Sequence, residues 1–124
     1  PGMGDGGPCH PRDNIALSWL AEKLDLGYDL FSDIIRSREV QAKNIADELL
    51  KHNLPVHIMG KAFKPAVNLT DGSASMLVGH YVEQAGKTVI YDLPSEEPAV
   101  YLLAHDQTYS TKNILLIYLL HRSD

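Results

Sequence analysis

The chain has one cysteine, no run of basic residues and no long apolar segment. A single cysteine cannot form an internal disulfide, so its thiol is free. The longest purely apolar run, Ile114 to Leu120, is far too short to cross a bilayer, and the amino terminus lacks a signal-peptide pattern. The net charge of −5 argues against nucleic acid as a partner. These absences predict a cytoplasmic protein that binds neither membranes nor nucleic acid.

The sequence also lacks an initiator methionine. It opens at Pro1, inside a glycine-rich stretch that no strand or helix precedes. We therefore expect a piece of a longer protein. Its 124 residues have room for one compact domain, or for a small domain with an appendage that needs a partner to cover it, and we expect the second arrangement.

The first half of the chain predicts two helices. After Asp13, read as an N-cap, apolar residues recur at helical spacing until Gly27 ends the pattern. A longer amphipathic helix begins near Asp29 and stops at Asn53. Two helices this short cannot cover both of their apolar faces by themselves. We therefore expect residues 1–54 to form a helical segment that packs against another part of the molecule or a partner.

From Pro55 the pattern changes to strands. The sequence predicts strands at 56–59 and 88–92 joined by a helix at 73–85, which makes a right-handed βαβ unit with a parallel pair. A third strand is predicted at 99–104. A fourth is predicted at 114–120, where a buried helical turn fits nearly as well. The expected fold is therefore α/β: a two-helix segment, then a small Rossmann-like domain over 55–124 with a mainly parallel sheet.

Glycines near the amino terminus match the dinucleotide pattern G-x-G-x-x-G at Gly2, Gly4 and Gly7. That pattern needs a preceding strand and a helix that starts at once, and here Pro8 and Pro11 intervene. We reject the dinucleotide fingerprint and keep a flexible glycine turn as the simpler interpretation.

Cys9 follows these glycines and lies just before the first helix, beside a histidine and an arginine. Such surroundings favour a reactive thiolate, while a small buried core residue is the competing interpretation. Asp13 is either a helix cap or a carboxylate near the thiol. An unrelated thiol enzyme, using His57, His80 or His105 as a base, is a weaker third hypothesis.

A second candidate site is the loop Gly60 to Pro65, which follows the first strand, where α/β sheets commonly bind ligands. Lys64 offers a charge for a phosphate and Phe63 an apolar surface, or they are a solvated lysine and a core phenylalanine. Asp92 ends the second strand as a ribose-binding acid would, or as a turn residue. The histidines show no metal-ligand spacing, so we predict no metal site.

Two of these motifs together resemble the UDP-glucose/GDP-mannose dehydrogenase family. The segment Gly6 to Asp13 resembles its catalytic-cysteine signature, G-G-x-C-x-x-x-D, and Met59 to Pro65 resembles the G-x-A-F-K-P signature that opens its carboxy-terminal nucleotide-sugar domain. Their order and spacing fit the family as well. The likeness extends from Pro1 to about Asp106.

The resemblance implies an NAD-dependent nucleotide-sugar 6-dehydrogenase of the type that converts UDP-glucose to UDP-glucuronate in two oxidations through a cysteine thioester. It implies a homodimer formed through the paired helices. The substrate would be a UDP-sugar or a GDP-sugar, which the sequence does not distinguish. By this resemblance the catalytic residues are Cys9 and Asp13, the residues bordering NAD are Cys9, His10, Pro11 and Arg12, and the substrate-binding residues are Gly2, Gly4, Gly6, Phe63, Lys64 and Arg122.

The sequence departs from the family in three places. The family's amino-terminal NAD-binding domain is missing before Pro1, so we expect the fragment alone to be inactive. Asp71 stands where a NAD-contacting arginine falls, and a helix that precedes the third strand is reduced to Pro94 to Pro98. These departures motivate an alternative, a non-catalytic nucleotide-sugar-binding or dimerisation module.

Overall fold

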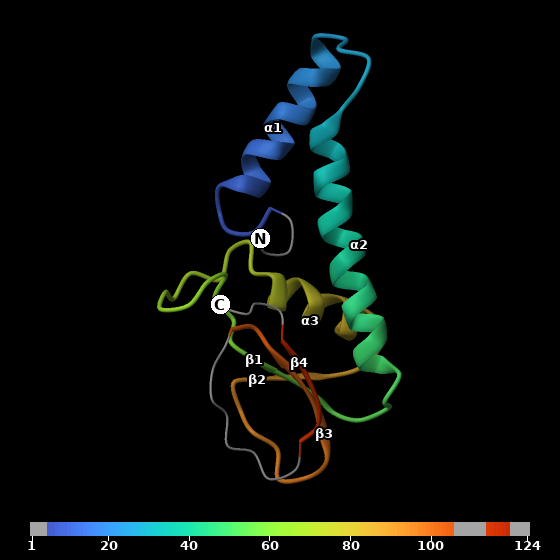
Figure 1. The fold of residues 1–124 in the computed structure, drawn as a ribbon, viewed down its shortest axis with the longest axis vertical. Coiled ribbons are helices and arrows are strands. Elements are labelled where there is room, and N and C mark those ends of the chain that lie inside the picture. The colour runs from blue at the N-terminus through green and yellow to red at the C-terminus, as the bar shows by residue number, and fades with distance from the viewer. Residues whose placement is uncertain (1–4, 106–113, 120–124) are drawn as a thin grey trace.

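The computed structural model describes residues 5–105 and the backbone of residues 114–119. It confirms the α/β class: a helical hairpin is followed by a small parallel sheet with one more helix (Figure 1). The elements in chain order are α1 (His10–Lys23), α2 (Leu30–Leu50), β1 (Val56–Met59), α3 (Ala74–Gln84), β2 (Val89–Tyr91), β3 (Ala99–Leu103) and β4 (Ile114–Leu119).

The strands form one sheet in the order β2-β1-β3-β4, and every neighbouring pair is parallel. The predicted βαβ unit is therefore present, with α3 connecting β1 to β2. The last apolar run is strand β4, so its interpretation as a helical turn was wrong. From β1 the chain moves outward to β2 and then crosses back to β3 on the other side, which makes the β1/β3 boundary the point where the winding direction reverses.

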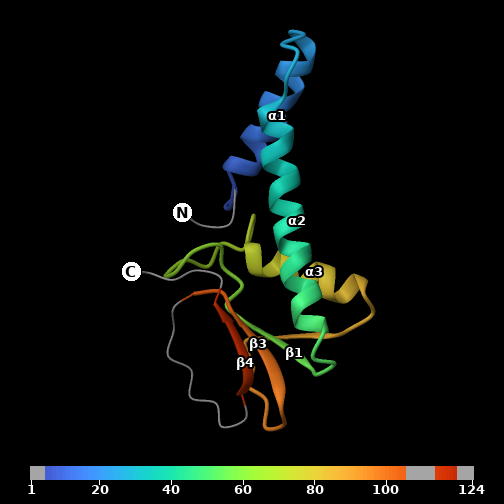
Figure 2. The same ribbon diagram turned by 45° about the vertical axis from the view of Figure 1, so that its right-hand side comes forward.

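The main core lies between one face of this sheet and two helices. Alternate residues of β1 and β3 point into it, as expected of a pleated strand whose side chains change face at every residue. The carboxyl-terminal half of α2 packs with α3 over these strands (Figure 2). The buried core residues are Ala42, Ala46, Leu49, Val56, Ile58, Val78, Val82, Val89, Val100 and Leu102.

The opposite face of the sheet has a smaller buried cluster. His57 of β1 stacks on Tyr101 of β3 with ring centroids 5.2 Å apart. The His57 Nδ1 also donates to the carbonyl oxygen of Leu93, 2.7 Å away, in the β2–β3 connection. That connection, residues 92–98, contains no helix. The helix expected before the third strand is therefore absent from this connection, as predicted at Pro94 to Pro98. His57 holds the connection against the sheet through its hydrogen bond to Leu93.

The start of α1 differs from the prediction. Cys9 is the N-cap and the helix begins at His10, so Asp13 lies inside the first turn and is not the cap. Pro11 explains the shift, because proline lacks only an N–H that the first helical turn does not use, and its fixed φ suits that turn. The thiol is thus part of the helix terminus.

The turn between the helices also differs in detail. α1 ends at Lys23, before Gly27, because Asp25 takes a left-handed conformation (φ 49°) and interrupts the helix earlier. The start of α2 is as predicted. The Asp29 carboxylate accepts hydrogen bonds from the N–H groups of Phe31 and Ser32. The Ser18 hydroxyl also donates to Asp29, and this bond is the main cause of a lowered Asp29 pKa.

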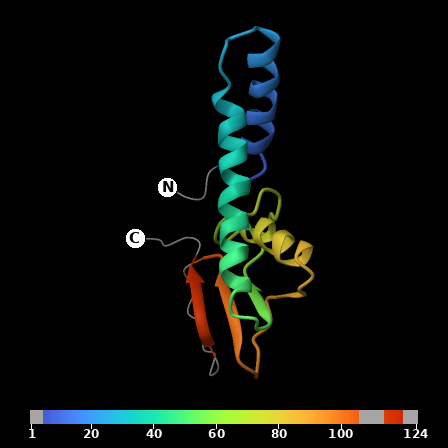
Figure 3. The same ribbon diagram turned by 90° about the vertical axis from the view of Figure 1, so that its right-hand side faces the viewer.

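α1 and the first half of α2 form an arm that extends away from the sheet (Figure 3). The arm is tied to the rest of the molecule by the continuous α2 helix, whose other half lies in the main core. Among the described residues, no helix is long and apolar enough to cross a membrane.

Candidate functional site

Two glycine-containing loops meet beside the amino-terminal end of α1. We call residues 5–9 the cysteine loop and residues 60–73 the β1–α3 loop. The Gly7 N–H donates to the carbonyl oxygen of Gly72 at 3.0 Å. A Cβ placed on Gly72 would lie 2.0 Å from the Gly7 oxygen, and one on Gly7 would lie 3.1 Å from two ring atoms of Phe63. The contact therefore needs glycine at 72, and it sets the cysteine loop against Phe63.

The β1–α3 loop is itself held by hydrogen bonds at its start. The Gly60 N–H donates to the Asp92 carboxylate at 2.7 Å, and the Ser75 hydroxyl donates to the Gly60 carbonyl oxygen at 2.7 Å. Further along, the Phe63 N–H donates to the Leu69 carbonyl oxygen at 3.0 Å. Asp92 thus fastens the loop, which favours the turn interpretation over a ribose-binding acid.

A cavity of about 280 Å³ opens at the carboxyl ends of β1 and β3. Its walls include Lys61, Lys64 and His105. This is the place where the winding of the sheet reverses, and open α/β sheets bind ligands in the crevice that such a reversal leaves beyond the strand ends. The two lysines give it a positive charge suited to a phosphate group.

His105 is a buried residue in the wall of this cavity. Its Nε2 donates to the carbonyl oxygen of Ala62 at 3.1 Å. Its Nδ1 is buried and has no hydrogen-bond partner among the described residues. No hydrogen bond joins the Cys9 thiol to a histidine in the described part of the chain, so nothing there supports the hypothesis of an unrelated thiol enzyme with a histidine base.

Cys9 is exposed at the amino-terminal end of α1, where the helix dipole favours negative charge. Its carbonyl oxygen accepts the Asp13 N–H at 2.9 Å, which places Asp13 one turn along the same side of the helix. The Asp13 carboxylate lies 2.9 Å from the Arg12 Nε, with both side chains more than half exposed. This hydrogen bond and the charge of Asp13 raise the pKa of Arg12.

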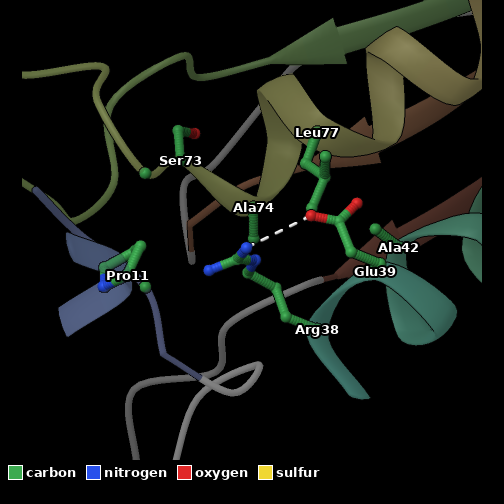
Figure 4. Close-up of a pocket in the computed structure, with 9 residues that line it drawn as sticks. Pro11, Arg38, Glu39, Ala42, Ser73, Ala74 and Leu77 are labelled. Carbon is green, nitrogen blue, oxygen red and sulfur yellow. Dashed lines mark hydrogen bonds and ion pairs between the residues drawn. The ribbon is translucent and has the colours of Figure 1, made fainter. Parts of the chain in front are cut away.

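A second cavity, of about 230 Å³, lies between the cysteine loop, α2 and the start of α3 (Figure 4). Pro11 forms one wall, Arg38 and Glu39 of α2 a second, and Ser73 with Ala74 a third. Glu39 accepts a hydrogen bond from the Tyr81 hydroxyl of α3 at 2.7 Å, which is the main cause of a raised Tyr81 pKa.

Asp5 is a residue that sequence reasoning missed. Its carboxylate is buried and accepts hydrogen bonds from the Arg38 Nη1 at 2.9 Å and from the Asn14 Nδ2 at 2.7 Å. The only sequence signal was an acidic residue among glycines, because its main partner lies 33 positions away.

Known proteins with similar sequences were found for most of this chain. No family model matches the chain. The chain is 28% identical over 116 residues to the UDP-glucose 6-dehydrogenase TuaD of Bacillus subtilis, a match that covers 89% of the chain and 25% of that protein. It is 34% identical over 85 residues to the GDP-mannose 6-dehydrogenase of Azotobacter vinelandii, covering 64% of the chain and 20% of the relative.

A solved structure agrees with these relatives. The chain superposes on the GDP-mannose dehydrogenase of Pseudomonas aeruginosa, crystallised as a ternary complex, with a TM-score of 0.65 and 25% identity, over 73% of the chain and 21% of that structure. The chain belongs to the UDP-glucose/GDP-mannose dehydrogenase family. It spans about a fifth to a quarter of the length of these relatives.

Within this dehydrogenase-family chain, the structure brings some predicted site residues together and not others. The cysteine loop meets Phe63, and Lys64 lies over the Phe63 ring at 5.3 Å from its centroid. Asp71 is exposed in the β1–α3 loop. Gly2, Gly4 and Arg122 lie outside the described residues. Within the described part of the chain, no group of three or more His, Cys, Asp and Glu side chains is arranged to hold a metal.

Proposed function

We propose that the chain is the thiol-bearing and nucleotide-sugar-binding part of an NAD-dependent nucleotide-sugar 6-dehydrogenase. One observation carries the proposal: the cysteine loop is docked on the β1–α3 loop by the Gly7–Gly72 hydrogen bond and by Phe63. This docking brings a loop of each family-like motif, Gly6 to Asp13 and Met59 to Pro65, beside the other. The names of the relatives support UDP-glucose and GDP-mannose as candidate sugars.

The β1–α3 loop would bind the nucleotide sugar. Lys64, beside the cavity at the strand ends, would contact a phosphate or sugar oxygen, and Phe63 would provide an apolar surface. Gly6 is exposed in the cysteine loop and leaves the backbone open to the sugar.

Cys9 would carry the covalent step. Its sulfur would bond to the carbon of the intermediate aldehyde while the aldehyde oxygen takes up a proton. That adduct would become a thioester on losing a hydride to NAD and its hydroxyl proton to solvent. Water would then hydrolyse the thioester to the carboxylate and release the thiol. Asp13, one helical turn away, would hold or accept the proton of that water.

The residues at the start of α1 fit a cofactor that approaches from solvent. His10 and Arg12 are exposed and Pro11 is half-buried, so these side chains are free to border a nicotinamide. NAD supplies the hydride acceptor for both oxidations when it is bound. Asp71 is exposed and negatively charged, so it offers no positive charge to the phosphates of NAD. In this proposal the rest of the cofactor is therefore held by other residues.

Alkylation of Cys9 tests the proposal. We expect iodoacetamide to modify Cys9 of the folded chain near pH 7 faster than in the urea-unfolded chain, because the exposed sulfur lies at the amino-terminal end of α1, where the helix dipole attracts negative charge. UDP-glucose or GDP-mannose should protect it. Lys64→Ala should raise the sugar concentration that gives half-protection by about tenfold, which corresponds to about 1.4 kcal/mol for one charge-assisted hydrogen bond. Mass spectrometry measures the modified fraction.

Lys87→Ala is the matched control, since the Lys87 side chain is exposed and donates a hydrogen bond to Asn53, away from both loops. It should leave half-protection unchanged. Protection combined with an ordinary alkylation rate would favour the non-catalytic nucleotide-sugar-binding or dimerisation module. The absence of protection by either sugar would rule out both forms of the proposal.

We also propose that the helical arm packs against a second copy of the chain. Apolar side chains on α1, on the turn after it and at the start of α2 are each more than half exposed. Several large apolar side chains exposed on one arm are typical of an interaction surface. The arm extends away from the sheet, so two copies could lie side by side along it (Figure 3). The residues concerned are Ile15, Trp19, Leu24, Tyr28 and Leu30.

Light scattering after gel filtration tests this association. The wild-type chain should have twice its 13.7 kDa mass. Trp19→Glu should weaken the dimer by about thirtyfold or more, because a buried tryptophan at an interface contributes about 2 kcal/mol or more. Leu93→Glu alters an equally exposed residue away from the arm and should leave the mass unchanged. A monomeric wild-type chain at high concentration would contradict the proposal.

A further inference from the structure

Asp5 is a buried charge in an otherwise glycine-rich loop. Its residue exposure is 6%, and it lies four residues before Cys9. Burying a carboxylate is costly unless charge and hydrogen bonds compensate it. Here both oxygens are used: Oδ1 accepts from the Arg38 guanidinium at 2.9 Å and Oδ2 from the Asn14 amide at 2.7 Å. The loop is therefore held at this point by two helices at once.

Arg38 connects this contact to the rest of the molecule. Its side chain is only 17% exposed, and a second nitrogen lies 3.2 Å from the Glu39 carboxylate. Glu39 in turn accepts the Tyr81 hydroxyl of α3. The cysteine loop, α1, α2 and α3 are thus joined through consecutive polar contacts. The Arg38–Glu39 contact in this series lies on the wall of the 230 Å³ cavity (Figure 4).

The loop has a second, independent attachment on its other side. Gly7 bonds to Gly72 and packs on Phe63 of the β1–α3 loop. Cys9 follows both attachments and occupies the N-cap position of α1, without a capping hydrogen bond from its side chain. The Asp5 contacts fix the loop to the helices, and the Gly7 contacts fix it to the sugar-binding side. The position of the thiol relative to a bound sugar depends on both.

We propose that Asp5 and Arg38 are positioning residues for Cys9: their buried ion pair, completed by Asn14, holds the cysteine loop where the thiol meets a nucleotide sugar on the β1–α3 loop. This inference rests on the proposed function. Neither residue touches the reacting atoms, so both act through the loop that they hold.

Reversal of one hydrogen bond tests the assignment. Asp5→Asn keeps the shape and an acceptor for Arg38, but it removes the buried negative charge that pairs with the guanidinium, and the Asn14 amide must turn over to accept from the new amide. The double variant Asp5→Asn/Asn14→Asp returns a carboxylate to this contact, reverses its donor and acceptor, and keeps the net charge. Rescue by the second substitution is therefore expected only if this contact itself matters.

Two measurements apply to each variant. Amide hydrogen exchange reports loop order without ligand: we expect exchange at Gly7, whose N–H bonds to Gly72, to rise by about tenfold or more in Asp5→Asn and to return to within about twofold of wild type in the double variant. Protection of Cys9 from iodoacetamide reports positioning toward the sugar. The UDP-glucose or GDP-mannose concentration for half-protection should rise by about tenfold and then recover in the same order.

Lys43→Ala is the matched control, because it removes an exposed ion pair with Asp47 on the same helix α2. It should change neither measurement. If Asp5→Asn lowers the melting temperature but leaves loop exchange and half-protection at wild-type values, the pair is merely structural and the inference is wrong. If neither nucleotide sugar protects wild-type Cys9, the proposed function fails. Hydrogen exchange in Asp5→Asn, and its recovery in the double variant, then decides by itself whether Asp5 orders the loop.

Discussion

Replacing Gly72 with alanine is expected to lower the free energy of unfolding by about 3–4 kcal/mol, because the new methyl group collides with backbone and the residue is left-handed. Its Cβ would lie 2.0 Å from the Gly7 oxygen, and the φ angle of Gly72 is +69°. A backbone atom cannot swing aside as a side-chain end can. The two loops must therefore separate, which also breaks the Gly7 hydrogen bond.

Gly86→Ala is the matched control for this prediction. Gly86 has a similar φ of +87°, and a Cβ there would meet nothing within 4 Å. It should lose only about 1–2 kcal/mol, the cost of a left-handed alanine. Urea denaturation compares the two variants, and hydrogen exchange at Gly7 reports the loop contact. Equal losses in both variants would mean that the Gly7–Gly72 approach contributes nothing.

The second large effect is expected for Leu49→Ala, with a loss of about 3–4 kcal/mol in the free energy of unfolding. Leu49 is fully buried (0% exposed) and packs where α2 meets α3 and the sheet. Leu49 is the largest fully buried side chain that α2 contributes to the main core, where the smaller Ala42 and Ala46 are also buried and Ile45 and Leu50 are partly buried. A cavity at Leu49 should therefore loosen the arm from the sheet as well as destabilise the whole.

Leu93→Ala makes the same chemical change at a residue that is 62% exposed, and should cost less than about 0.5 kcal/mol. Because only the Leu93 carbonyl bonds to His57, alanine there keeps that hydrogen bond. Urea midpoints measure both variants. A Leu49→Ala loss no greater than that of Leu93→Ala would show that the α2 half of the core is not well packed.

Elements with strong local signals were predicted well. The strand at Val56–Met59 was predicted at its observed bounds, and α3 and the start of α2 within a residue. Apolar periodicity and the Asp29 cap depend on residues that are close in the sequence, so they can be recognised without knowledge of the fold. The start of α1 was missed because two local signals competed, and Pro11 prevailed over Asp13 as the mark of the first turn.

The site divides in the same way. The cysteine and G-K-A-F-K-P motifs, and hence the family, could be recognised from the sequence because each motif is a short local pattern. Whether Gly2, Gly4 and Arg122 bind substrate stays a prediction, as do the domain boundaries at 54 and 55. The hydrogen bonds of Asp92 and His57, by contrast, join strand ends that only the sheet brings together.

The sequence by itself determined the α/β class, the parallel βαβ unit and the presence of a thiol before a helix. Tertiary structure alone decided that Gly7 rests on Gly72 and Phe63, and that Asp5 is buried against Arg38. The physical reason is the distance along the sequence over which each interaction acts. Periodicity, caps and motifs act within a few residues, whereas a buried ion pair or a backbone contact depends on segments tens of residues apart that meet only when the core forms.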